Sequence, residues 1–198
     1  MNLFSIGLIA AMLPLSLFSA AHAEVPPAAL GEDAPAFALQ DQNGKPVSLG
    51  DYAGKIVVLE WVNPDCPFVK RHYGENTMTT LAGDFQDKDV AWLAIATGHT
   101  ANAPALQHFA QQHKLAWPIL LDHDGAVARA FGAKTTPHMF IIGKDGKLLY
   151  RGGIDNDPAG DKTDRINYVH EALDEITAGK PVSHPDTRPY GCSVKYPK

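Results

Sequence analysis

The stretch KIVVLEWVNPDCPFVKRH, residues 55–72, decides the fold. Its first part, residues 55–62, is apolar for most of its length and rich in β-branched residues, which is typical of a strand buried on both faces. Pro67 then suits the first turn of a helix, because the N–H that it lacks would have no helical partner there. The stretch therefore predicts a buried strand that ends just before a helix, with Cys66 at the junction.

Cys66 is the first candidate for chemistry. A thiol at this position faces backbone N–H groups without helical partners and the positive end of the helix dipole, and both favour the thiolate. Lys70 and Arg71 follow within the first turns and add positive charge. Buried, inert cysteines are common in proteins, but the Pro, Asp and Lys around this one argue against deep apolar burial. The pattern therefore favours a reactive thiol.

Strand and helix patterns alternate along the rest of the chain. Residues 37–41 and 45–49 flank an Asn-Gly pair, which is a strong hairpin signal. The apolar run 90–97 predicts a second buried strand, and the intervening segment 67–81 is long enough for a helix, so a parallel crossover is expected. Further helices are expected at 104–115, 125–131 and 165–178, and further strands at 117–121, 139–142 and 148–150.

This order of elements predicts the fold class. Strands interleaved with helices, an antiparallel hairpin near the end and a closing helix indicate an α/β domain with a mixed central sheet covered by helices on both faces. The Asn-Gly hairpin is an amino-terminal extension of that domain.

A Thr-Pro pair, Thr136-Pro137, directly precedes a predicted strand. Pro137 alone is compatible with the first residue of an edge strand. Together with Cys66, however, the pair resembles the thioredoxin superfamily, whose members place such a proline, after a cis peptide bond, opposite the reactive cysteine. The segment GEDAPAFALQDQNGKPVSLGDYAGKIVVLEWVN, residues 31–63, is similar to the opening of redoxin and peroxiredoxin-like (AhpC/TSA-like) exported proteins. The resemblance covers most of residues 31–178 and implies a thioredoxin-like fold.

The chain departs from the two better-known subfamilies at specific positions. Thioredoxins use Cys-x-x-Cys, but the residue three before Cys66 is Asn63, which excludes exchange through an adjacent cysteine. Peroxiredoxins use Pro-x-x-x-Thr-x-x-Cys, and here Leu59 and Asn63 take the places of the Pro and the Thr. The position of the distant arginine of peroxiredoxins corresponds to Pro137 in this chain. Asn63 still offers a hydrogen-bonding side chain to a peroxide.

The missing arginine has two possible substitutes, Arg129 and Arg151, if the fold brings either near the thiol. The segments Asn63 to Val69 and Pro189 to Tyr196 resemble most closely a peroxiredoxin-like exported group that is defined by sequence more than by an established reaction. The resemblance therefore implies the fold more firmly than the substrate.

Cys192 is the second of the two cysteines of the chain and lies in a tail that contains Pro and Gly. In a flexible tail it is able to reach back to Cys66, form a disulfide and so act as a resolving cysteine. The alternatives are a permanent structural disulfide, which contributes about 2–4 kcal/mol, and no pairing at all. Redox-active pairing is the favoured hypothesis among the three.

The amino terminus indicates export. Residues 1–23 carry no Asp, Glu, Lys or Arg, are rich in Leu, Ile, Phe and Ala, and close on an Ala-His-Ala triplet, as a secretory signal peptide does. A retained membrane anchor is the alternative, but Pro14 interrupts a run that needs about 20 apolar residues. We expect cleavage before Glu24, a periplasmic or secreted protein, a thioredoxin-like domain at 24–180 and an irregular tail at 181–198.

The charge distribution and the spacing of the histidines limit the kinds of partner and cofactor that we expect. The net charge of −5 comes from interspersed acidic and basic residues, so neither nucleic acid nor, after signal cleavage, a membrane is expected as a partner. The histidines do not have ligand spacing with Cys66, and no metal or cofactor is expected. Among the histidines, His138 is the one candidate for a metal ligand near the thiol, because the residue after the cis proline lies close to the thiol in this fold.

Taken together, these patterns predict an exported thiol-dependent oxidoreductase. Cys66 is the expected nucleophile and Cys192 the possible resolving residue, while Thr136 and Pro137 form a backbone platform for an extended thiol substrate. The expected partners are a thiol or disulfide protein, or a peroxide, together with an external thiol reductant. The alternatives are a thiol peroxidase with an antioxidant role and a non-catalytic binding or copper-carrying module.

Overall fold

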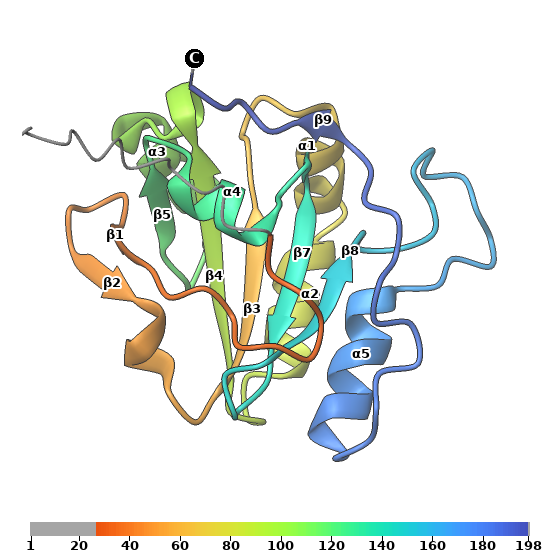
Figure 1. Cartoon of the computed structure of the whole chain (residues 1–198). Helices are drawn as coiled ribbons and strands as arrows, with labels where there is room; N and C mark the ends of the chain where they lie inside the picture. Colours follow the sequence, from red (N-terminus) through yellow and green to blue (C-terminus); the bar gives the residue numbers. More distant parts are fainter. Residues whose placement is uncertain (1–26, 198) are drawn as a thin grey trace, which may run out of the picture.

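A computed structural model describes residues 27–197, so the predicted signal peptide lies outside the described residues. A five-stranded sheet of order β5-β4-β3-β7-β8 forms the centre of the molecule (Figure 1). Its strands are β3 (Ile56–Trp61), β4 (Val90–Thr97), β5 (Ile119–Asp122), β7 (His138–Ile142) and β8 (Leu148–Gly152). The helices are α1 (Pro67–Gly74), α2 (Thr77–Asp84), α3 (Ala103–Gln112), α4 (Ala126–Phe131) and α5 (Tyr168–Thr177), with short 3-10 turns η1 (Leu49–Tyr52) and η2 (Gly98–Thr100). Two small pairs complete the fold: β1 (Ala38–Gln40) with β2 (Pro46–Ser48), and β6 (Thr135–Thr136) with β9 (Cys192–Ser193).

The strand β3 occupies the middle of the sheet. All of its residues are buried, as its apolar sequence predicts. It runs parallel to β4 and antiparallel to β7, and Trp61 at its end lies opposite His138. This pairing brings the loop after β3 and the segment before β7 to the same end of the sheet.

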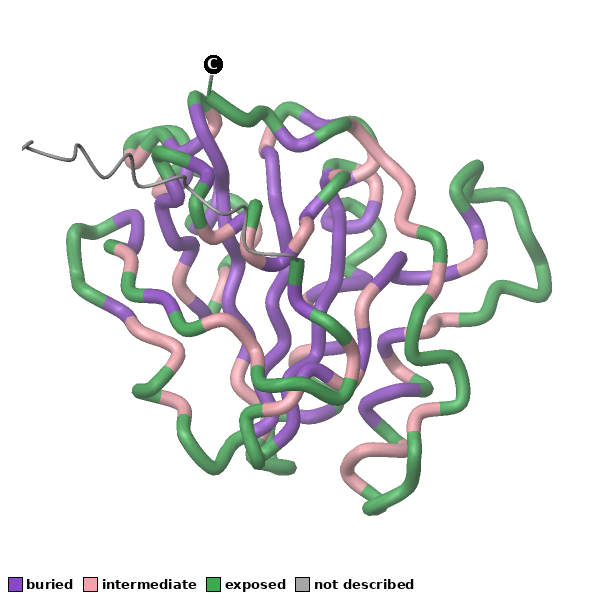
Figure 2. Tube along the Cα trace, in the orientation of Figure 1, coloured by how far each residue is buried: buried purple, intermediate pink, exposed green. Residues whose placement is uncertain are grey.

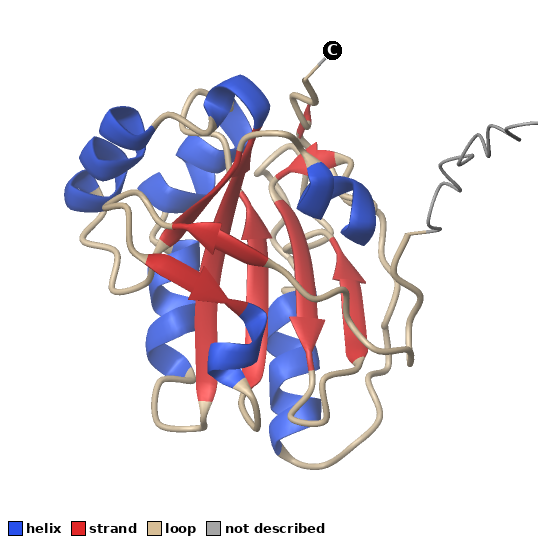
Figure 3. Ribbon diagram, turned by 60° about the vertical axis from the view of Figure 1, so that its left-hand side comes forward, coloured by secondary structure: helices blue, strands red, loops and turns tan. Residues whose placement is uncertain are grey.

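Side chains of β3 alternate between two apolar cores, one on each face. Val58 packs in the core that α1, α2, α3 and α5 cover, whereas Leu59 packs in the core that α4 and the β1–β2 hairpin cover. Figure 3 shows helices on both sides of the sheet, and Figure 2 shows that its strands are buried along most of their length. The predicted α/β class with a mixed sheet and an amino-terminal hairpin is confirmed.

The segment expected to form one helix at 67–81 forms two. Helix α1 ends at Gly74, and α2 begins at Thr77. Between them Asn76 adopts a left-handed backbone conformation, with φ of 58°, which asparagine tolerates better than most residues and which a continuous right-handed helix does not permit. The single-helix prediction was wrong because apolar spacing does not register such a break.

The last helix is shorter than expected. We predicted a helix at 165–178, but α5 begins at Tyr168 because Asn167 caps it, its side chain accepting a hydrogen bond from the His170 N–H at 3.0 Å. Beyond α5 the chain is irregular as expected, except for one short strand. It returns across the end of the sheet, and Cys192–Ser193 form β9 against β6.

Among the described residues there is no helix with the length and apolar character needed to cross a membrane.

One carboxyl group is buried in the core. Glu60 in β3 is fully buried, and its Oε2 accepts hydrogen bonds from the Tyr73 hydroxyl at 2.8 Å and from the Trp92 ring N–H at 3.5 Å. Its Oε1 is buried and has no hydrogen-bond partner among the described residues. Burial raises the pKa of this carboxyl to about 7, although the two donors favour the charged form.

The Glu60→Gln variant tests this burial. Because the pKa of Glu60 is raised in the folded protein, the contribution of its carboxyl group to stability is fully present below the ordinary pKa of 4.5. This contribution is lost as the pH rises toward 7. The amide keeps an acceptor for Tyr73 and has no charge to desolvate. At pH 8 we therefore expect the variant to exceed the wild type in unfolding free energy by about 3 kcal/mol, at about 1.4 kcal/mol per pKa unit.

Urea unfolding of both proteins between pH 4 and 8 measures the effect. The difference in unfolding free energy should grow with pH through this window. A difference that stays constant with pH would contradict the assignment of the titration to Glu60.

Candidate functional site

Cys66 lies at the amino-terminal end of α1, one loop after β3. It is the N-cap residue of the helix, with Pro67 in the first helical turn, as the sequence predicts. The loop is closed locally, because the Cys66 N–H donates to the Asn63 carbonyl at 3.0 Å and the Asn63 side-chain oxygen accepts from the Asp65 N–H at 3.0 Å. These hydrogen bonds fix the position of the thiol at the helix end.

The Thr136–Pro137 peptide bond is cis, and it lies beside this thiol. Because Trp61 pairs with His138 across β3 and β7, the residues that follow one strand and precede the other meet. The Cys66 Sγ donates a hydrogen bond to the Thr136 carbonyl at 2.9 Å. The fold therefore brings together the two segments that the sequence analysis singled out.

Cys192 completes the cluster from the carboxyl-terminal segment. In the antiparallel pair of β6 and β9 it lies opposite Thr136, and its side chain is within hydrogen-bonding reach of Cys66. Both cysteines are thiols in the structure. Cys66, Thr136, Pro137 and Cys192, all predicted as site residues, thus lie in one place.

The two thiols differ in acidity. Burial raises the pKa of Cys66, but hydrogen bonds from the Cys192 and Thr136 side chains and from the backbone N–H groups of Val69 and Cys192 outweigh burial, so that its pKa lies below the ordinary value. Burial and the neighbouring Cys66 raise the pKa of Cys192 to about 11. Cys66 therefore ionises first, and Cys192 keeps its proton and donates it to the Cys66 sulfur.

Asn63 is near the thiol, but its side chain shapes the loop. Its oxygen is already engaged by the Asp65 N–H, and the residue is buried. The two arginines considered as substitutes are engaged elsewhere. Arg129 donates to the Asp124 carbonyl and lies over the Tyr196 ring.

Arg151, the other candidate, forms an ion pair with Asp186 at 2.7 Å and donates to the Ala28 carbonyl. Neither guanidinium contacts Cys66 within the described part of the chain. Neither of these two arginines therefore stands where peroxiredoxins place theirs to polarise a peroxide.

His138 follows the cis proline and is buried. Its Nδ1 accepts a hydrogen bond from the Lys134 N–H at 3.1 Å, and burial lowers the pKa of the imidazole to about 3. Within residues 27–197 no group of three or more His, Cys, Asp and Glu side chains is arranged to hold a metal ion. His138 accepts a hydrogen bond from the backbone just before β6, and it is not part of a metal-binding group among the described residues.

A polar cluster on the helix that carries Cys66 was not predicted from the sequence. His72 in α1 is buried, and its Nε2 lies 2.9 Å from the Tyr190 hydroxyl. That hydroxyl also contacts the buried Asp155 and accepts from Arg71 Nη2 at 3.3 Å. Tyr190 belongs to the terminal motif that carries Cys192, which was the one available signal for its role.

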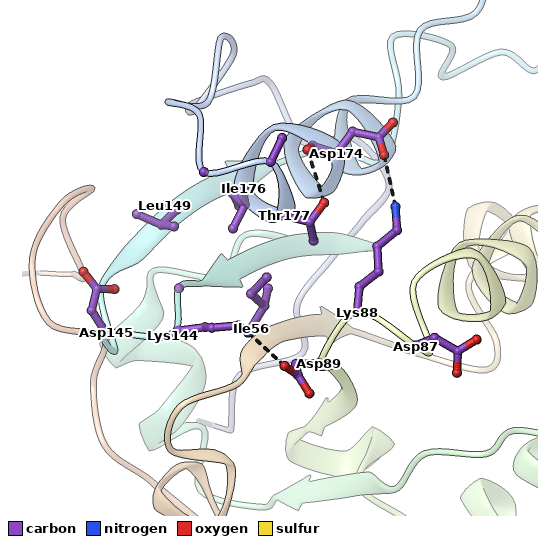
Figure 4. Close-up of a pocket in the computed structure, with 13 residues that line it drawn as sticks. Ile56, Asp87, Lys88, Asp89, Lys144, Asp145, Leu149, Asp174, Ile176 and Thr177 are labelled. Carbon is purple, nitrogen blue, oxygen red and sulfur yellow. Dashed lines mark hydrogen bonds and ion pairs between the residues drawn. The ribbon is translucent and has the colours of Figure 1, made fainter.

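One roomy cavity of the molecule lies away from this site. A cavity of about 880 Å³ lies between β3, β8 and α5, with Ile56, Lys88, Lys144 and Asp174 in its wall (Figure 4). Ile56 is at the start of β3 and Cys66 follows its end, so the cavity is at the opposite end of the sheet. Cys66 is buried and Cys192 is half-buried, and neither thiol lines that cavity.

The fold and the paired thiols define a thioredoxin-fold thiol protein. The AhpC/TSA family matches residues 30–151, and the chain belongs to this family. Thiol-disulfide oxidoreductase ResA of Geobacillus thermodenitrificans is 32% identical over 143 residues, which cover 71% of this chain and 79% of that protein.

Solved structures agree on the fold. An uncharacterized conserved protein from Geobacillus kaustophilus is similar with a TM-score of 0.77 and 29% identity, over 85% of this chain and 93% of that one. A putative thiol:disulfide interchange protein DsbE from Chlorobium tepidum has a TM-score of 0.56 and 25% identity, over 63% of this chain and 84% of that one. The predicted thioredoxin-like fold is confirmed, and these relatives support a thiol-disulfide oxidoreductase of the thioredoxin superfamily.

The acidity of Cys66 gives a test of the thiol pair. In the Cys192→Ala variant the Cys66 thiolate loses a hydrogen-bond donor, so we expect the pKa of Cys66 to rise. Cys192→Ser keeps a donor and should shift the pKa less. Thiolate absorbance at 240 nm across a pH titration measures both, and equal titration curves for wild type and Cys192→Ala would contradict the contact.

Proposed function

We propose that this protein is an exported thiol-disulfide oxidoreductase in which Cys66 is the nucleophile and Cys192 is the resolving cysteine. The observation that carries the proposal is the contact between the two thiols at the amino-terminal end of α1. One thiol has a lowered pKa, and the other lies on a strand that pairs with Thr136. A helix-capping thiolate with a second thiol in reach is the arrangement that exchange requires.

The proposed exchange has two steps. The Cys66 thiolate attacks one sulfur of a partner's disulfide, the Cys66–partner bond forms, and the partner's other sulfur leaves as a thiolate that takes up a proton. Cys192 then loses its proton and attacks Cys66 Sγ, which forms the Cys66–Cys192 disulfide and releases the second partner sulfur as a thiol. The partner disulfide is reduced, the protein is oxidised, and an external dithiol returns it to the starting state.

The edge formed by Thr136 and Pro137 supports a role in holding the partner. An extended segment, β9, already pairs with Thr135 and Thr136 there, so the edge accommodates extended backbone beside the thiol. A partner segment that displaces β9 pairs with the same edge and places its own sulfur next to Cys66.

Disulfide exchange is favoured over peroxide reduction by the surroundings of the thiol. The Asn63 side-chain oxygen is occupied within its loop, and both candidate arginines are engaged elsewhere. A peroxide oxygen would lack the guanidinium that polarises it in peroxiredoxins, whereas exchange at sulfur needs only the thiolate and an accessible disulfide.

Export is part of the proposal and rests on residues 1–23, outside the described residues. Their composition supports a secretory signal cleaved before Glu24. The proposed compartment is the periplasm or the exterior, where a disulfide between the two cysteines persists. The amino-terminal peptide of the exported protein, read by mass spectrometry, reports the cleavage site.

Reduction of insulin disulfides in the presence of a dithiol tests the two cysteine roles. Cys66→Ser should abolish the activity. Once it is reduced and the dithiol is removed, Cys192→Ser should trap a mixed disulfide between Cys66 and its partner, because no second thiol is left to resolve it, and intact mass should show one adduct, on Cys66. Full activity of Cys66→Ser, or an adduct on Cys192 in the wild type, would contradict the assignment. In the same preparation, peroxide should be consumed no faster than by a free thiol.

A further inference from the structure

The carboxyl-terminal segment is seated firmly at the thiol end of the sheet. We call residues 189–194 the strap, which is the dark blue segment that leads into and through β9 in Figure 1. Past Cys192, the Val194 N–H donates to the Lys134 carbonyl at 3.0 Å, and the Val194 side chain is buried in the core on the α4 face. The strap thus covers Cys66, which is only 1% exposed.

Gly191 allows the backbone of the strap to lie close to the backbone of β6. Its φ is +135°, and a Cβ atom at this position would lie 2.1 Å from the Thr136 carbonyl oxygen. Any other residue would have to move the strap away from Thr136, and Cys192 with it. Contact between the thiols therefore depends on how closely this segment is held.

Tyr190 anchors the strap just before that close approach. Its ring packs against Phe68 of α1 with ring centroids 5.9 Å apart. Its hydroxyl reaches a polar cluster formed by His72, Arg71 and Asp155, which come from α1 and from the loop after β8. A single side chain of the strap is thereby tied to the helix that carries Cys66.

The protonation states in this cluster are set by burial. Burial lowers the pKa of His72 to about 4, against the opposing effect of Asp155, so the imidazole is neutral at pH 7. Burial and the Asp155 carboxylate raise the pKa of Tyr190, so its phenol keeps the proton and donates it to Asp155. The phenol oxygen accepts from Arg71 Nη2 and lies 2.9 Å from Nε2 of His72, while Nδ1 of His72 and Oδ2 of Asp155 are buried without a hydrogen-bond partner among the described residues.

We propose that Tyr190 is a positioning residue for the thiol pair. Its hydrogen bonds to Asp155, His72 and Arg71 hold the strap in place, and through the strap they keep Cys192 against Cys66 and keep Cys66 away from solvent. The consequence for the reaction rests on the proposed function, because it concerns closure of the Cys66–Cys192 disulfide. The effect of Tyr190 on access to Cys66 does not depend on that function.

The Tyr190→Phe variant keeps the ring against Phe68 and removes only the hydroxyl. The strap should leave more often, so Cys66 becomes more accessible, while its pKa rises because the Cys192 donor is absent for more of the time. A structural defect unrelated to the strap would not raise the pKa of Cys66 and its accessibility together. In the disulfide exchange itself, the less ordered Cys192 should make the Cys66–Cys192 bond easier to reduce.

Alkylation of Cys66 by iodoacetamide measures access. In the full chain carrying Cys192→Ser, the rate is followed across pH, which separates the pKa from the limiting rate of the thiolate. With Tyr190→Phe added, we expect a limiting rate about tenfold higher, since loss of a hydrogen bond to a charged group shifts an equilibrium by at least that factor. The matched control is Tyr52→Phe, outside the strap, which should leave the rate unchanged.

The pKa and the redox equilibrium are measured with Cys192 present. For Tyr190→Phe, absorbance at 240 nm should show a raised pKa of Cys66, and equilibration with reduced and oxidised glutathione should show a smaller disulfide fraction than in wild type. Gly191→Ala should change access, pKa and disulfide fraction in the same directions by a separate route, so it carries the test if Tyr190→Phe does not fold.

Unchanged alkylation in both strap variants would overturn the proposal, and so would an equal rise in Tyr52→Phe. If alkylation changes as expected but wild type forms no Cys66–Cys192 disulfide in glutathione buffers, the strap assignment stands and the proposed resolving role of Cys192 fails. If the disulfide forms in wild type and neither strap variant alters it or the pKa of Cys66, the positioning role of Tyr190 fails while the resolving role stands.

Discussion

The antiparallel pairing of β3 with β7 is the constraint on which the site depends. It places the end of one central strand beside the start of its neighbour, so that Cys66 meets the Thr136 carbonyl at 2.9 Å. Because β3 is buried along its whole length, the pairing cannot slip by one residue without turning apolar side chains from one core to the other. The position of the thiol is thus determined by the packing of the sheet, and the loop that carries Cys66 has little freedom of its own.

The second thiol comes from a place distant in sequence. With Asn63 three residues before Cys66, the chain has no adjacent cysteine, and Cys192 reaches the same sulfur through β9. The second cysteine therefore depends on tertiary contacts that are able to form and release, where an adjacent cysteine would be fixed by the helix itself. In this protein the close packing at Gly191 and the hydrogen bonds of Tyr190 hold Cys192 near Cys66. They take the place of the short sequence separation between two adjacent cysteines.

Much of this arrangement is predictable from local sequence. The buried strand, the cysteine at the helix end and the proline with its cis peptide bond follow from short-range patterns and a family resemblance. The cluster around Tyr190 does not, because His72, Asp155 and Tyr190 are far apart in sequence, and the terminal motif around Tyr190 does not indicate which residues it contacts. The break at Asn76 and the pairing of β9 with β6 were not predicted for a similar reason, since both are decided by backbone conformation and tertiary packing rather than by apolar spacing, whereas the reach of Cys192 back to Cys66 was the favoured hypothesis.

Peptide mass mapping of the wild-type protein, before and after mild oxidation and again after reduction by a dithiol, tests the central claim most directly. If the two thiols form a working pair, a Cys66–Cys192 cross-linked peptide appears on oxidation and disappears on reduction. A bond that is present throughout and resists the dithiol, or no cross-linked peptide under any condition, would contradict the account.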